Sequence, residues 1–422
     1  MTSMAINRQR NVVLAGHADS GKTTLAEHLL HAAGAITRLG KVDDGTAVLD
    51  FEPEEHKRQL SLSLAMAGLD HDGHHVTLID TPGYADFSGE MISGFAAADG
   101  ALLTMDASGG VEAGTERAIG LGRSTGKAAL FVITRCDREN ADPTAALDAL
   151  RATFGTKIAP LQLAIGRAEG FRGYVDLVHR RAWEWSGPGK RSEVAIPEEL
   201  ADEVARRRDQ LLEAAAEADD DVLAKYLEGE EVSDAELEAC LHRGVRDSIL
   251  APVLVSAASK DIGTEGLLDA IIRYLPSPDE EPPVKARDGK GNEVEVAPDA
   301  GGPLLAQVFK TTADPFVGRL SYFRVFSGSI SSHDHVWNAA RGEEERIGQV
   351  LRVKGKETEP VGTVRAGEIG AVAKLVHTVT GDTLSTRERP LTLAPLSFPE
   401  PSLPVAIEPE TKTDLDLSLI HI

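Results

Sequence analysis

Cysteine is almost absent from this chain, which has two among 422 residues, Cys136 and Cys240. Two distant cysteines form neither the disulfide framework of a small secreted domain nor the ligand cluster of a structural zinc site. The sequence therefore predicts two reduced thiols and a cytoplasmic location.

Positive charge is also scarce. The sequence has 44 Lys and Arg residues against 67 Asp and Glu residues, a net charge of −23 with a pI near 5.0. Proteins that coat nucleic acid need a surplus of Lys and Arg to neutralise phosphates. We therefore expect no DNA partner, whereas recognition of a structured RNA through a local basic patch stays compatible with this composition.

Long apolar runs are missing as well. The sequence contains no stretch of about 18 apolar residues, the length that spans a bilayer. Residues 1–10 also lack the apolar core of a signal sequence. We therefore expect no membrane partner. The 42% of hydrophobic residues provides for a sizeable core, and the chain length is enough for two or three domains.

A phosphate-binding loop is the clearest motif that the chain does contain. It follows a strand expected over 11–15 and reads G-x-x-x-x-G-K-T: Gly16, His17, Ala18, Asp19, Ser20, Gly21, Lys22 and Thr23. The glycines let backbone N–H groups turn toward phosphate oxygens, the lysine reaches the outer phosphates, and the threonine hydroxyl binds Mg²⁺. Thr24 completes the site at the start of a helix expected over 23–33, whose positive end favours phosphate.

A second motif, D-T-P-G at residues 80–83, lies 58 residues beyond Lys22. It ends a strand expected over 75–79. We expect the Asp80 carboxylate to hold Mg²⁺ through water and the Gly83 N–H to contact the γ-phosphate. Alone, this motif is also typical of an ordinary turn after a strand.

Two further segments point to guanine. Asp137 follows a strand expected over 128–133 and can accept hydrogen bonds from guanine N1–H and its exocyclic amine, a pair that adenine lacks. Arg135 can stack on the base plane. Ser256, Ala257 and Ala258 follow a strand expected over 252–255, and we expect their N–H groups to contact guanine O6.

The coarse pattern predicts two kinds of architecture. Strands and helices alternate through the first part, which indicates a parallel sheet covered by helices. Further elements are expected there as strand 100–106, helices 112–123 and 143–154, short strands within 158–185, acidic helices 197–218 and 233–247, and helix 265–275. A Pro- and acid-rich run over 276–283 indicates a linker. Short strands with glycine turns follow over 304–393, which is typical of a closed antiparallel β-barrel.

With these motifs in order, the chain resembles the translational GTPases, most closely the elongation factor G family and its divergent members. The resemblance runs from about residue 11 to residue 414. It is also found in segments outside the nucleotide motifs: 137–142, 171–177, 312–320, 380–384, 398–401 and 407–412.

The resemblance implies an α/β P-loop GTPase domain with a mostly parallel sheet over 8–285, including an inserted α+β subdomain at about 158–252. An antiparallel β-barrel domain follows over 286–396, and the start of a truncated third domain over 397–422. The last seven residues, 416–422, do not resemble the family's next helix, so we expect a truncated end.

The family's function is implied in the same way: binding of GTP and GDP with Mg²⁺, and ribosome-linked hydrolysis of GTP to GDP and phosphate. The implied partners are ribosomal RNA and the stalk proteins of the large subunit, and we expect a monomer. Two alternatives stay open. One is a GTP-dependent, ribosome-associated switch with weak hydrolysis, and the other is a ribosomal protection or recycling factor.

Three positions depart from the family pattern. Tyr84 stands where the family has the histidine that orients the attacking water, and a phenol, which keeps its proton at neutral pH, cannot act as that histidine does. The family's R-G-I-T-I reads R-Q-L-S-L over 58–62, so Ser61 offers the hydroxyl for Mg²⁺. Thr134 has a hydroxyl where the N-K-x-D motif has an amide, which predicts weaker contacts. No catalytic residue is assigned, and we expect slow hydrolysis or hydrolysis through another group.

Overall fold

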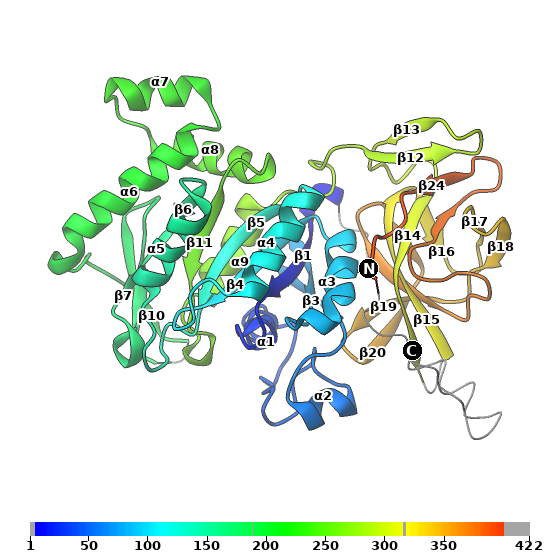
Figure 1. The fold of residues 1–422 in the computed structure, drawn as a ribbon, viewed down its shortest axis with the longest axis horizontal. Coiled ribbons are helices and arrows are strands. Elements are labelled where there is room, and N and C mark those ends of the chain that lie inside the picture. The colour runs from blue at the N-terminus through cyan, green and yellow to red at the C-terminus, as the bar shows by residue number, and fades with distance from the viewer. Residues whose placement is uncertain (1–4, 188, 315–317, 401–422) are drawn as a thin grey trace.

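The computed structural model describes residues 5–187, 189–314 and 318–400. Its two parts lie side by side, an α/β part and a β-rich part (Figure 1). Residues 401–422, which hold most of the expected third domain, lie outside the described residues. The expected domain boundaries near residues 285 and 396 stay predictions.

A seven-stranded sheet forms the centre of the α/β part. Its strand order is β2-β3-β1-β4-β5-β11-β6, and every neighbouring pair is parallel except β2 and β3. The mostly parallel sheet expected from the alternating pattern is thus confirmed. The strands are β1 Gln9–Gly16, β2 Ala65–His71, β3 His74–Asp80, β4 Gly100–Asp106, β5 Ala128–Thr134, β6 Ile158–Pro160 and β11 Ala251–Val255.

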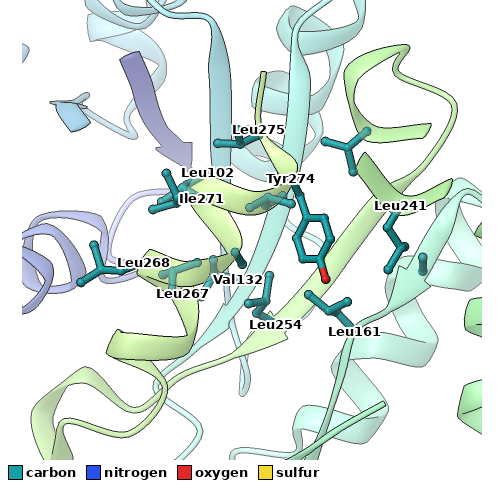
Figure 2. Packing of buried hydrophobic residues seen from close by; sticks show 14 of the residues in the cluster. Leu102, Val132, Leu161, Leu241, Leu254, Leu267, Leu268, Ile271, Tyr274 and Leu275 are labelled. Atoms are coloured by element: carbon teal, nitrogen blue, oxygen red, sulfur yellow. The ribbon is translucent and has the colours of Figure 1, made fainter. Parts of the chain in front are cut away.

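Both faces of this sheet are covered. Successive residues of a strand point to opposite faces, so buried neighbours in one strand indicate packing on both sides. In β1, Val13 and Leu14 are fully buried in two different hydrophobic clusters. Figure 2 shows the second of these faces, where Leu268 and Ile271 of α9 lie beside Leu102 of β4. The helices of this part are α1 Lys22–Ala32, α2 Pro53–Arg58, α3 Ser88–Ala97, α4 Ala113–Thr125, α5 Pro143–Phe154 and α9 Thr264–Tyr274.

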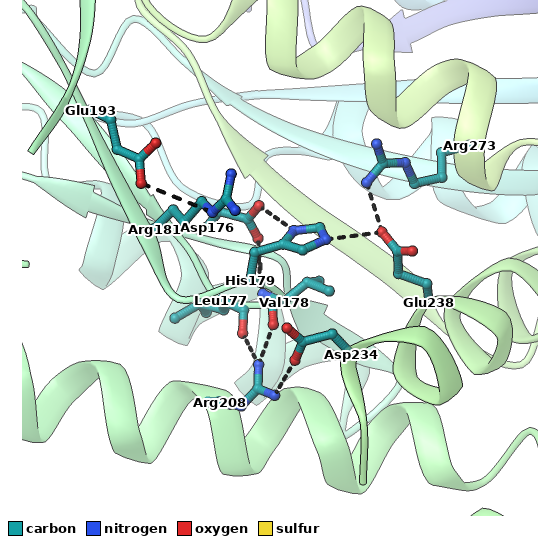
Figure 3. Close-up of polar contacts among 10 residues, drawn as sticks. All are labelled: Asp176, Leu177, Val178, His179, Arg181, Glu193, Arg208, Asp234, Glu238 and Arg273. Carbon is teal, nitrogen blue, oxygen red and sulfur yellow. Dashed lines mark hydrogen bonds and ion pairs between the residues drawn. The ribbon is translucent and has the colours of Figure 1, made fainter.

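A smaller α+β unit lies between β6 and β11. Its antiparallel sheet has the order β10-β9-β8-β7. Figure 3 shows how helix and sheet are joined: Arg208 donates to the carbonyl of Val178, and His179 lies between Asp176 and Glu238. The elements are β7 Gln162–Ile165, β8 Gly173–Asp176, β9 Arg181–Trp185, β10 Arg191–Val194, α6 Ala201–Ala216, α7 Asp220–Glu228 and α8 Asp234–Arg246.

The Pro- and acid-rich run over 276–283 connects the two parts, but it is not a loose tether. Ser277 is 2% exposed. The carboxylate of Glu280 contacts the imidazole of His242 at 2.8 Å, and Glu281 pairs with Lys127 at 2.9 Å. These contacts pin the run to the α/β part, a fact that composition alone did not indicate.

The β-rich part consists of antiparallel ladders, and two separate apolar clusters lie among its described residues. Eight strands follow the order β18-β17-β23-β14-β15-β22-β19-β20, so among the described residues this sheet has two ends and is not a closed ring of ladders. Its strands are β14 Leu305–Asp314, β15 Gly318–Ser327, β17 His335–Asn338, β18 Glu343–Arg346, β19 Val350–Lys354, β20 Glu357–Val361, β22 Ile369–Ala373 and β23 Thr383–Ser385. Two small sheets accompany it, formed by β12 Val284–Asp288, β13 Glu293–Val296 and β24 Leu391–Leu393, and by β16 Ser329–Ser331 and β21 Thr363–Arg365.

Buried polar contacts join the two parts. The guanidinium of Arg324 pairs with Asp99 at 2.7 Å, and these side chains are 3% and 6% exposed. Asn11 donates to the same carboxylate and to the carbonyl of Gly367. Since each of these groups needs a partner away from water, the contact fixes the mutual position of the two parts.

Candidate nucleotide-binding site

The predicted site residues gather at one edge of the seven-stranded sheet. The phosphate loop follows β1, Asp80 ends β3, residues 134–137 begin at the end of β5, and residues 256 and 257 follow β11. Parallel strands bring their carboxyl ends to the same edge, which is where ligands bind in such sheets. The fold therefore unites segments that are more than 200 residues apart in sequence.

The phosphate loop has a backbone shape that needs glycine at two points. Gly21 has a φ of 82°, in the left-handed region. A Cβ added to Gly16 would lie 2.4 Å from the carbonyl oxygen of Thr104. Gly83 is equally confined, because its added Cβ would meet the nitrogen of Ala18 at 2.5 Å. The Gly83 backbone thus lies directly against the phosphate loop.

Lys22 is buried inside this loop. Its ammonium group donates to the carbonyl of His17 at 2.7 Å and lies 3.4 Å from that of Gly16. Burial lowers the pKa of Lys22 to about 8, because the charged form loses its water. The negative charge of bound phosphates would stabilise the protonated ammonium of Lys22.

Oxygen ligands for a cation lie beside Lys22. The Thr23 hydroxyl donates to one carboxylate oxygen of Asp80 at 2.5 Å, and it lies 3.3 Å from the Ser61 hydroxyl. Within the described residues, the other oxygen of Asp80 is buried without a hydrogen-bond partner. Burial raises the pKa of Asp80 to about 7. Hard oxygen donors around an unpartnered carboxylate oxygen fit Mg²⁺.

Asp50 belongs to the same region and was missed by sequence reasoning. Asp50 is 1% exposed, and its carboxylate lies beside the side chain of Glu55. Burial raises the pKa of Asp50 and that of Glu55. Both charges in turn help to raise the pKa of Asp80. No periodicity or motif marked Asp50, which lies in a segment without regular structure.

The guanine-reading segment is held by specific side-chain contacts. Arg135 has a φ of 56°, pairs with Asp106 at 3.1 Å, and lies against Gly21 of the phosphate loop. The Asp137 carboxylate accepts a hydrogen bond of 2.8 Å from the hydroxyl of Ser259, a residue that sequence reasoning did not single out. These contacts fix the side chains of Arg135 and Asp137, two residues apart in the chain.

The expected donors to guanine O6 need correction. The N–H of Ser256 donates to the carbonyl of Ile133, and the N–H of Ala257 donates to that of Ile262, so neither is free for a base. The short helix Ala258–Lys260 begins directly afterwards. The first N–H groups of a helix have no partner within it, so of the three expected donors Ala258 stays available and the N–H of residue 259 joins it.

Comparison with known proteins agrees with this geometry. The family model of the elongation factor Tu GTP-binding domain matches residues 7–277, and that of elongation factor G domain 2 matches residues 303–387. The chain belongs to the translational GTPases of the elongation factor G family.

Individual relatives point the same way. Elongation factor G of Thermotoga petrophila is 37% identical over 97% of this chain, and that of Thermotoga neapolitana is 36% identical over the same share. A crystal structure of a protein from Thermus thermophilus superposes with a TM-score of 0.83 at 35% identity over 97% of this chain. The chain spans 59% of the length of each of these proteins.

The three departures from the elongation factor G pattern have different consequences. Thr134 keeps a contact to the phosphate loop, because its hydroxyl donates to the carbonyl of Ser20 at 2.7 Å. Ser61 keeps its hydroxyl beside Thr23. Tyr84 is 39% exposed at the start of the short helix Ala85–Phe87 and lines the phosphate end of the site.

Within residues 5–187, 189–314 and 318–400, no helix is long and apolar enough to cross a membrane.

Proposed function

We propose that this chain binds GTP and GDP and is the nucleotide-binding part of a ribosome-linked GTPase of the cytoplasm. The observation that supports this most is the meeting of Lys22, Asp80 and Asp137 at one sheet edge, in the order of phosphate, cation and base. The proposed units are a GTP-binding domain over 8–285 with a subdomain at about 158–252, and a second domain over 286–396.

The proposed contacts follow from the site. Backbone N–H groups of residues 16–21 and the ammonium of Lys22 hold the β- and γ-phosphates, with Thr24 behind them. Asp137 reads the guanine edge and Arg135 stacks on its plane. The N–H groups of residues 258 and 259 take the O6 contact that was first assigned to residues 256–258.

Thr23, Ser61 and Asp80 are the proposed residues for Mg²⁺, which when bound neutralises phosphate charge that develops during transfer. The N–H of Gly83 lies beside the loop and is the proposed sensor of the γ-phosphate. Bound phosphates would also favour the charged form of Lys22, which burial disfavours.

The proposed partners are ribosomal RNA and large-subunit stalk proteins, with a monomeric chain. A second candidate is a GTP-loaded, ribosome-associated switch with little turnover, which Tyr84 at the histidine position favours. Protection or recycling of ribosomes is a further alternative on the same architecture.

Nucleotide binding is the first test. Titration with fluorescent GDP, in competition with GTP or ATP, should show displacement by GTP and weak displacement by ATP. Equal competition by ATP would reject the guanine assignment. Single-turnover hydrolysis with and without ribosomes then separates a GTPase from a switch, and Tyr84→His is expected to raise the rate by about 10²-fold if the histidine alone is missing.

A further inference from the structure

We propose that the side-chain amide of Gln59 orients the attacking water during GTP hydrolysis, at a site where Tyr84 cannot do so. This inference rests on the proposed GTPase function. It assigns the role of the missing histidine to a second residue that lines the same cavity as Tyr84.

The backbone of Gln59 is the first observation. Gln59 follows α2 with φ 54° and ψ 40°, a left-handed conformation that favours glycine. The R-G-I-T-I pattern of the elongation factor G family has glycine at this position. This chain has a long amide side chain there at the cost of backbone strain, and such strain clusters at functional sites.

The location of Gln59 is the second observation. Gln59 and Ser61 line the same cavity as Lys22, Gly83 and Tyr84. The Ser61 hydroxyl, two residues further on, is 3.3 Å from that of Thr23. Gln59 therefore lies at the end of the site that Lys22, Thr23 and Ser61 form.

The freedom of the Gln59 side chain is the third observation. Its backbone N–H is used by the end of α2, where it donates to the carbonyl of Glu55. Among the described residues, the exposed carboxamide has no hydrogen-bond partner. The neighbouring cations are engaged differently, since Lys57 and Arg58 both pair with Glu54. Gln59 thus lines the cavity with an amide whose acceptor and donor are both available.

The chemistry of an amide suits this role. Its oxygen accepts a hydrogen bond from water and its NH₂ donates to a phosphate oxygen, which is how a glutamine positions water in other GTPases. The water oxygen forms a bond to the γ-phosphorus, and the bond from that phosphorus to the β–γ bridging oxygen breaks. GDP leaves with the electron pair, and the water proton passes to the released phosphate. The amide orients the water and neither gains nor loses a proton.

The decisive variant is Gln59→Gly in the 422-residue chain, because glycine keeps the left-handed backbone and removes only the amide. Lys57→Ala is the matched control, an exposed residue of α2 outside the cavity. For each protein we would measure the affinity for fluorescent GDP and GTP, and then single-turnover hydrolysis with and without ribosomes.

The expected result is a hydrolysis rate about 10²-fold lower in Gln59→Gly, with nucleotide affinity unchanged and Lys57→Ala like the wild type. In a Tyr84→His background, the same substitution should cost much less, since the histidine takes over the water.

An unchanged rate in Gln59→Gly would overturn the inference, and so would a loss of rate that merely follows a loss of affinity. Turnover that is absent from the wild type under all conditions would also overturn it, while leaving GTP binding intact. Failure of the wild type to bind any guanine nucleotide would reject the proposed function itself. The titration with fluorescent GDP and GTP would reveal such a failure before any hydrolysis is measured.

Discussion

The hydroxyl of Thr23 and the carboxylate of Asp80 are joined by a hydrogen bond of 2.5 Å across 57 residues of sequence. One residue lies in the first turn of α1 and the other ends β3, so the bond exists only because β1 and β3 are paired in parallel. It leaves the second oxygen of Asp80 buried and unpartnered among the described residues. This oxygen is the one that the proposed Mg²⁺ site would use.

Asp80→Asn should weaken Mg²⁺-dependent nucleotide binding by about 10- to 100-fold, because the charge that attracts the ion is removed while the shape is kept. Titration of fluorescent GDP at graded Mg²⁺ concentrations measures this. Asp70→Asn, an exposed carboxylate of β2 that pairs with His75, is the control and should bind like the wild type. Equal Mg²⁺ dependence in both variants would contradict the assignment.

Stability of the nucleotide-free protein should fall as pH rises from about 4 to 7. The folded-state pKa of Asp80 is raised to about 7 from an ordinary 3.8, so the folded protein keeps a proton that the unfolded chain releases. The raised pKa values of Asp50 and Glu55 act in the same direction. Denaturant unfolding measures the free energy of unfolding across this pH range. Its decline should be smaller in Asp80→Asn than in the wild type, by on the order of 2–4 kcal/mol. An identical pH dependence of the unfolding free energy in the two proteins would contradict a proton held by Asp80 in the folded state.

Ser259→Ala should weaken GDP binding by about fivefold, the usual worth of one hydrogen bond, because Asp137 loses the donor that holds its carboxylate. The same substitution should lower the affinity for inosine nucleotides, which lack the exocyclic amine, by a smaller factor than the affinity for guanine nucleotides. Ser256→Ala is the control, since that hydroxyl donates to Ile262 and not to Asp137. Competition binding with guanosine and inosine diphosphates provides the comparison, and parallel losses for both bases would argue against a role in base reading.

Arg324→Met should destabilise the chain by about 3–5 kcal/mol, because it leaves the buried carboxylate of Asp99 without its cation. Adding Asp99→Asn should restore part of the loss, since no buried charge then remains. Lys285→Ala removes an exposed ion pair with Glu293 and should cost less than about 1 kcal/mol. Chemical denaturation measures the stability of each variant. A loss of stability in Arg324→Met no larger than in Lys285→Ala would contradict a stabilising role of the Arg324–Asp99 contact.

Long, strongly patterned elements were predictable. Strand 100–106 and helix 143–154 have in the structure the bounds expected for them. Helix α3, Ser88–Ala97, was not expected, because two glycines and two serines lower its helix propensity. It forms because Met91 and Phe95 are fully buried against the sheet. Strand β2, Ala65–His71, was also missed, since its one partner is β3 across a short hairpin.

The sequence by itself determined the order of the phosphate, cation and base motifs, because each is a short run whose chemistry depends on neighbouring residues. Tertiary structure decided what depends on groups that are far apart or on backbone direction. It placed the free N–H groups at residues 258 and 259, brought Ser259 to Asp137 across 122 residues, and buried Asp50 near Asp80. It also brought Gln59, the left-handed residue that ends α2, to the cavity that Lys22 and Thr23 line.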